Sequence, residues 1–67
     1  MDDIFPKPIL GLLERETYSW DEMERLGWRY EGAKSQNRET LELWNQLGFW
    51  ATANLDGKIL SIDKQKK

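Results

Sequence analysis

Apolar residues recur at helical spacing near the start of the chain, in residues 8–16. At this spacing Ile9, Leu12 and Leu13 fall on one face of a helix. Pro8 can serve as the first helical residue, where its missing N–H costs nothing. The pattern predicts a helix over residues 8–16. A strand stays open as the alternative, because short apolar runs fit either structure.

The clearest predicted helix begins after Ser19. Ser19 and Glu22 have the spacing of a capping box, in which each side chain accepts a hydrogen bond from the other residue's backbone N–H. The apolar residues that follow share one helical face: Trp20, Met23 and Leu26. Gly27 is the natural end of this helix, since glycine readily adopts the left-handed conformation that closes helices.

A third helix is predicted over residues 37–47. Asn37, or Ser35 before it, can cap this helix, and Glu39 suits the positive end of the helix dipole. The apolar stripe consists of Leu41, Trp44 and Leu47. Gly48 follows as the predicted end of the helix.

Residues 49–62 have the pattern of a β-hairpin. The dipeptide Asp56-Gly57 lies between two apolar runs and favours a tight two-residue turn. The cross-strand pairs that this turn predicts are Ala51 with Ile62 and Ala53 with Leu60. With these pairs one side of the hairpin is apolar, which supports the register.

Together these elements predict an α+β domain with three short helices followed by a C-terminal β-hairpin. Residues 28–31 alternate apolar and charged side chains, which adds a short extra strand, and residues 32–37 follow as a polar loop. Residues 1–67 are predicted to form a single small domain. Within it, residues 1–7 are a loose lead-in and residues 64–67 a basic tail.

The composition leaves the hydrophobic core as the main source of stability. A chain of 67 residues buries only about 60% of its unfolded surface, and the absence of cysteine excludes disulfides. Large aromatic side chains are therefore expected to fill the core. The chain has four tryptophans: Trp20, Trp28, Trp44 and Trp50.

The missing residue types also bear on catalysis and metal binding. Without cysteine and histidine the chain lacks the usual zinc and iron ligands and the usual general base. Substrate pockets run to several hundred cubic ångströms, which so short a chain can hardly enclose. We therefore expect no enzyme, no catalytic residues, no metal, no cofactor and no small-molecule substrate.

The sequence carries no recognisable targeting or membrane signal. Its first residues are acidic, unlike the basic start of a signal peptide, and its longest apolar run, residues 8–13, is too short to cross a bilayer. We therefore expect a cytoplasmic protein with no membrane partner.

Charge is distributed unevenly along the chain, whose net charge is −2. Residues 1–33 carry four basic and eight acidic side chains, a net charge of −4, whereas residues 34–67 carry six basic and four acidic side chains, a net charge of +2. The positive half contains the predicted third helix and the hairpin.

The order of helix, helix, short strand, helix, glycine and hairpin resembles a compact winged helix-turn-helix domain. The resemblance covers residues 8–63 and includes the exit Leu47-Gly48-Phe49 from the third helix. The chain departs from the family in the long connection between its second and third helices and in a third helix that carries little positive charge. The resemblance implies duplex DNA binding and transcription regulation.

The resemblance also implies which residues contact DNA. Helix 37–47 would enter the major groove and hairpin 49–62 would contact the backbone. Arg38 would read guanine, and Asn45 and Gln46 would read adenine. The phosphate contacts would come from Lys34, Lys58 and Lys64. The same side chains are also ordinary for a solvated protein surface.

The alternative function is an acidic protein–protein interaction module. Such a module could be an adaptor, or an inhibitor of a host factor encoded by a mobile element. Acidic surfaces with aromatic anchors can dock on a basic partner, and the candidate anchors are Trp28, Tyr30 and Trp50. A subunit of a larger assembly is a third option.

Overall fold

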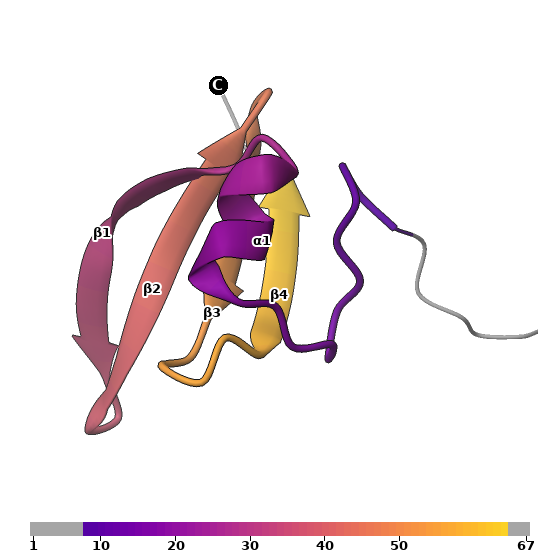
Figure 1. The fold of residues 1–67 in the computed structure, drawn as a ribbon. Helices are drawn as coiled ribbons and strands as arrows, with labels where there is room; N and C mark the ends of the chain where they lie inside the picture. Colours follow the sequence, from indigo (N-terminus) through magenta and orange to yellow (C-terminus); the bar gives the residue numbers. More distant parts are fainter. Residues whose placement is uncertain (1–7, 65–67) are drawn as a thin grey trace, which may run out of the picture.

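The structure is a computed structural model that describes residues 8–64 of the chain. Its elements are the helix α1 (Trp20–Arg25) and the strands β1 (Arg29–Gln36), β2 (Glu39–Gln46), β3 (Phe49–Ala53) and β4 (Ile59–Lys64). The strands form one antiparallel sheet in the order β1-β2-β3-β4, and α1 lies against one face of it (Figure 1). The predicted lead-in 1–7 and residues 65–67 of the predicted tail lie outside the described residues.

The predicted fold class, three helices followed by a hairpin, is wrong. Residues 8–16 are not helical, because Leu10 and Gly11 have positive φ angles and form a tight turn closed by two hydrogen bonds between Ile9 and Leu12. Residues 37–47 form a turn followed by β2 instead of a helix. The described residues are therefore mostly a four-stranded sheet with one short helix, closer to an all-β fold than to an α+β fold.

The error over residues 37–47 has an identifiable cause in the turn that joins β1 to β2. Asn37 and Arg38 both have positive φ angles, 51° and 66°, as the two central residues of a tight hairpin turn require. Asparagine favours such a turn as well as a helix cap. In the strand that follows, Leu41 and Trp44 point to opposite faces because side chains alternate along a strand.

The helix that begins after Ser19 is confirmed, with both bonds of its capping box. The backbone N–H of Glu22 donates to the Ser19 hydroxyl at 3.1 Å, and that of Ser19 donates to the Glu22 carboxylate at 2.8 Å. The helix has only six residues, so that its cap and its packing must hold it. Met23 is its buried residue.

The strand predicted near residues 28–31 is longer in the structure. β1 continues to Gln36 and so includes residues 32–36 of the segment 32–37 that was predicted as a loop, while Asn37 lies in the turn that follows. Its register against β2 shifts between Tyr30 and Gly32, so that Glu31 is an extra residue in a β-bulge.

The predicted C-terminal hairpin is present as β3 and β4, and the pair Ala51 with Ile62 is confirmed. The predicted two-residue turn at Asp56-Gly57 is wrong, because Asn54 pairs with Lys58 and the N–H of Gly57 donates to the carbonyl of Asn54, which places the turn at Leu55 and Asp56. Nearer the turn the register shifts, and Ala53 faces Ile59 instead of the predicted Leu60. The Asn54 side chain holds this turn, since its oxygen accepts hydrogen bonds from the N–H groups of Asp56 and Lys58. As a result Ile59 is buried and Leu60 is exposed.

The core lies between α1, the sheet and the segment that precedes α1. Its buried cluster comprises Leu12, Met23, Trp28, Trp44, Ala51, Ala53 and Ile59. The preceding segment also covers the outer edge of β4: Arg15 and Glu16 exchange backbone hydrogen bonds with Ile59, and the N–H of Tyr18 donates to the carbonyl of Gly57. In residues 8–64 we find no helix with the length and apolar character needed to cross a membrane.

Candidate functional site

The six residues predicted to contact DNA do not share one face. Arg38 lies in the β1–β2 turn, whereas Lys64 pairs with Phe49 at the other end of the sheet. Asn45 and Gln46 are neighbours on β2 and so point to opposite faces. Lys58 lies in the bridge to Thr17, and Lys34 lies on β1. The recognition helix that was to present these residues is absent, because 37–47 is a turn and a strand.

Gln46 has a structural contact instead of a free amide. Its Nε2 donates to the carbonyl of Leu26 at 2.8 Å, which ties the C-terminal end of α1 to β2. This contact satisfies one of the carbonyls that a helix end leaves without a partner.

The three aromatic residues predicted as partner contacts differ in exposure. Trp28 is 3% exposed, and its indole N–H donates to the carbonyl of Leu10 at 3.1 Å. Trp50 is half-buried on the face of the sheet that points away from α1. Tyr30 is 37% exposed and lies on the face that carries α1. Of the three, Tyr30 offers the most accessible ring.

Tyr30 belongs to an aromatic cluster that the sequence did not reveal. The rings of Trp20, Tyr30 and Trp44 contact one another, with centroid separations of 4.5, 4.8 and 5.3 Å. Trp44 is 1% exposed and forms the base of the cluster, whereas Trp20 is 45% exposed. The Trp20 N–H donates to the Glu24 carboxylate one helical turn later, which helps to fix the indole. The cluster therefore presents fixed aromatic rings at the surface.

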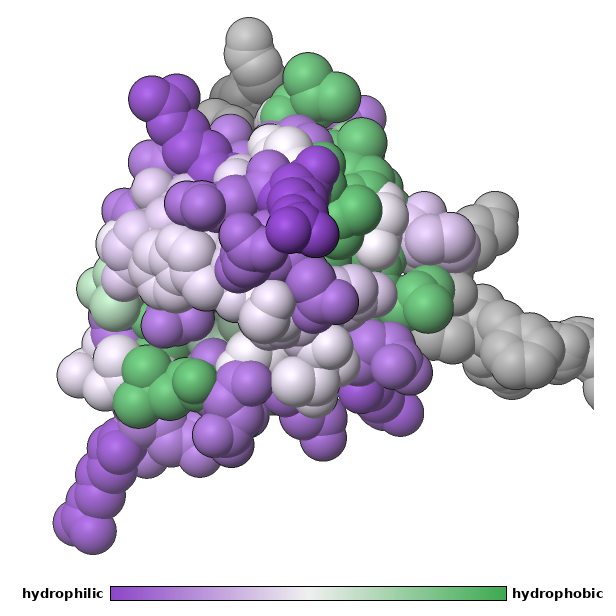
Figure 2. Space-filling view, in the orientation of Figure 1, coloured by the Kyte–Doolittle hydropathy of each residue, from purple (hydrophilic) through white to green (hydrophobic). Residues whose placement is uncertain are grey.

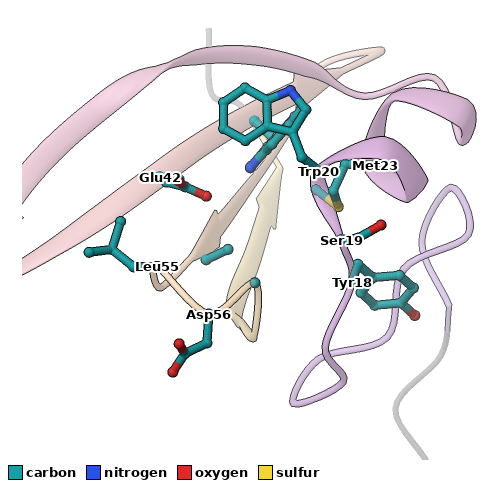
Figure 3. A pocket seen from close by; sticks show the side chains of 10 residues that line it. Tyr18, Ser19, Trp20, Met23, Glu42, Leu55 and Asp56 are labelled. Carbon is teal, nitrogen blue, oxygen red and sulfur yellow. The ribbon is translucent and has the colours of Figure 1, made fainter.

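A cleft of about 130 Å³ opens beside this cluster (Figure 3). The side chains that matter for its chemistry come from the start of α1, from β2 and from the turn after β3: Trp20, Met23, Glu42, Trp44, Leu55 and Asp56. In Figure 3 the Trp20 indole lies above the cleft, Glu42 and Leu55 lie on one side, and Asp56 lies below. Tyr18 and Ser19 line the side across from Glu42.

The cleft exists because small side chains surround Glu42 on the sheet. Glu42 pairs with Ala33 on β1 and with Ala53 on β3, and neither alanine fills the space over the sheet. The six residues of α1 span only about 9 Å at 1.5 Å per residue, so the helix leaves this part of the sheet uncovered.

The charged side chains that line the cleft are both acidic. Glu42 is half-buried, and among residues 8–64 no hydrogen bond or ion pair reaches its carboxylate. Asp56 is exposed at the rim, and no described basic side chain lines the cleft. The described residues contain no group of three side chains suited to hold a metal ion. The arrangement can therefore attract a positively charged group against aromatic rings.

Only part of this site was predicted from the sequence. Tyr30 was a predicted contact, but Trp20 was assigned to the core and Glu42 to the surface of a helix that does not exist. Comparison with known proteins finds no matching family model, no matching curated protein and no matching solved structure.

Proposed function

We propose that this chain is a non-enzymatic protein-interaction module that docks on a basic segment of a partner protein. The observation that supports the proposal is the side-chain-sized acidic cleft beside the exposed aromatic cluster. We call the exposed part of this region the docking surface, consisting of Trp20, Tyr30 and Leu55 around the cleft.

The composition of the docking surface is typical of binding hot spots. Trp20, Tyr30 and Leu55 are 45%, 37% and 67% exposed. Tryptophan and tyrosine are enriched among the few residues that carry most of the energy of protein interfaces. In Figure 2 this face shows separate apolar patches between hydrophilic side chains instead of one continuous apolar surface, as is common for interfaces that form and dissociate.

The size of the cleft favours a side chain of a partner over a small-molecule ligand. Ligand pockets usually enclose about 300–1,000 Å³, and the cleft encloses about 130 Å³. A cavity of about 150 Å³ takes a group the size of benzene. One side chain of an extended segment therefore fits the cleft, whereas a cofactor or a nucleotide does not.

The charge of the cleft favours a basic partner. Glu42 and Asp56 line it without a described basic side chain, and complementary charge speeds association and selects among partners. Duplex DNA is a poorer fit to this region, since its phosphates would meet both carboxylates. The DNA-binding prediction also depended on a helix over residues 37–47, where the structure has a turn and a strand. We therefore favour the protein-binding alternative over DNA binding.

A titration followed by amide chemical shifts tests the proposal. The probes are a short unstructured peptide of alternating arginine and serine and, separately, a short mixed-sequence DNA duplex. At low salt we expect the peptide to shift the Trp20 indole N–H and the amides of Glu42 and of residues 53–57. The Leu47-Gly48 turn, at the other end of β3, is the internal control and should not shift.

Two results would contradict the proposal. One is binding of the duplex, with shifts along β2 and β4, at concentrations where the peptide has no effect. The other is a peptide whose shifts are spread evenly over the chain, because diffuse attraction to a negative protein would then explain them without a site.

A further inference from the structure

We propose that the cleft beside Trp20 binds one arginine side chain of the partner, with its guanidinium against the Trp20 indole and paired with the carboxylate of Glu42, while Asp56 adds negative charge at the rim. This inference rests on the proposed function and specifies the group that the docking surface recognises.

Glu42 lines the cleft without a partner for its charge. The residue is half-buried, and no hydrogen bond or ion pair from residues 8–64 reaches its carboxylate. A partner that covered the cleft with a neutral apolar group would remove water from this carboxylate and leave it without a partner, which is costly. A group that carries positive charge and N–H donors removes this cost. The occupant of the cleft is therefore a cation with hydrogen-bond donors.

The shape of the site favours a guanidinium. The walls include the Trp20 and Trp44 indoles, and the hollow is close in size to a single planar ring. A guanidinium is planar, stacks on aromatic faces and is more weakly hydrated than an ammonium group. These properties suit a narrow space beside an indole, where lysine would lose more hydration and gain no stacking.

The two carboxylates differ in their placement. Glu42 comes from the middle of β2 and its carboxylate lies beside the cleft, whereas Asp56 comes from the turn after β3 and its side chain points away from Trp20 in Figure 3. A guanidinium has five N–H donors arranged in one plane and can bond the Glu42 carboxylate through two parallel N–H groups, while the charge of Asp56 adds to the attraction at the rim. The ammonium of lysine is a point charge and does not form this paired contact.

The start of α1 does not oppose the cation. Its capping box provides partners for the N–H groups of Ser19 and Glu22, and Asp21 and Glu22 place negative charge in its first turn. The partial positive charge of the helix end is thereby offset at the border of the cleft.

The test compares three glycine–serine peptides that differ at one central residue: arginine, lysine or citrulline, the neutral isostere of arginine. Each is titrated into the full chain at low salt, and the Trp20 indole N–H shift gives the affinity. We expect the arginine peptide to bind at least about tenfold more tightly than the citrulline peptide, because the charge-assisted bonds are lost. The lysine peptide should lie between them.

Two variants show whether the preference for arginine arises at the cleft. Glu42→Gln should lower the affinity for the arginine peptide about tenfold and leave the affinity for the citrulline peptide unchanged. Glutamine keeps the size of the side chain and removes its charge. Asp63→Asn is the matched control, since Asp63 is exposed on β4 outside the cleft and its change removes the same charge. A thermal melt of each variant checks that it is folded.

The outcomes separate this inference from the proposed function. If arginine and citrulline peptides shift the Trp20 indole equally well, or if Glu42→Gln and Asp63→Asn weaken binding equally, the arginine site is refuted while docking at the cleft stands. If neither these peptides nor the arginine–serine peptide shifts the cleft resonances, both the site and the proposed function are refuted.

Discussion

Replacing Trp44 with alanine should remove most of the stability of this domain. Trp44 is 1% exposed, lies on β2 and contacts the rings of Trp20 and Tyr30. Truncation of a buried tryptophan costs about 3–5 kcal/mol, and each lost aromatic pair accounts for about 0.5–1.5 kcal/mol within such a loss. A domain of 67 residues has a total stability of about 3–10 kcal/mol. The alanine variant should therefore be largely unfolded or close to it.

Urea denaturation followed by far-ultraviolet circular dichroism measures this loss. Trp20→Ala is the matched control, because Trp20 belongs to the same aromatic cluster but is 45% exposed. Its loss should be much smaller than that of Trp44→Ala. If Trp44→Ala does not fold, Trp44→Phe keeps a ring and should give a smaller, measurable loss. A loss below about 1 kcal/mol for Trp44→Ala, within the range of ordinary surface changes, would refute its place in the core.

Three backbone predictions can be checked with the same denaturation assay. Ser19→Ala should cost about 1 kcal/mol by removing the capping box, and an unchanged midpoint would show that the cap contributes nothing. Leu47→Asn should raise the free energy of unfolding by about 1 kcal/mol, because Leu47 is 80% exposed and has a φ of 49°, which asparagine tolerates better than leucine. A lower free energy of unfolding would mean that the Leu47 side chain has a packing role. Gly57→Ala should destabilise more than Gly48→Ala, since both glycines have positive φ but a Cβ at position 57 would meet the carbonyl of Tyr18, whereas position 48 is open; equal losses would contradict this packing.

Local chemistry made part of the fold predictable. The Ser19 capping box depends on two side chains three residues apart, and it is formed as the spacing predicts. The pair Ala51 with Ile62 was predicted from the need for one apolar side, and it is formed because the register shift next to Ala53 offsets the different turn. In both cases the residues that decide the structure are close in sequence.

The rest could not be predicted because the same residues satisfy two patterns. Leu41, Trp44 and Leu47 have helical spacing, but in the structure Leu41 and Trp44 lie on opposite faces of β2 and Leu47 is exposed in a turn. β2 buries residues on both of its faces, so its sequence does not show strict alternation of apolar and polar residues. The positive φ angles of Asn37 and Arg38, which decide in favour of a hairpin, are not visible in the sequence.

The candidate site was hidden for a related reason. The cleft depends on the pairing of Glu42 with Ala33 and Ala53, residues that lie on three different strands. Trp20 appears in the sequence as an apolar residue of a capped helix, whereas in the structure it is the first residue of α1 and is 45% exposed. A site formed by residues on three strands cannot be predicted from the sequence before the strand register is known.

The most direct test of the central claim is the affinity of the arginine–serine peptide for the chain and for two variants, measured by isothermal titration calorimetry. Trp20→Ala removes the exposed ring of the docking surface, and Leu47→Ala removes an exposed side chain at the other end of β3 as the control. If the cleft is the binding site, Trp20→Ala weakens binding by at least about tenfold, as expected for a hot-spot tryptophan, and Leu47→Ala binds like the unchanged chain. Equal affinities of all three proteins would contradict the claim.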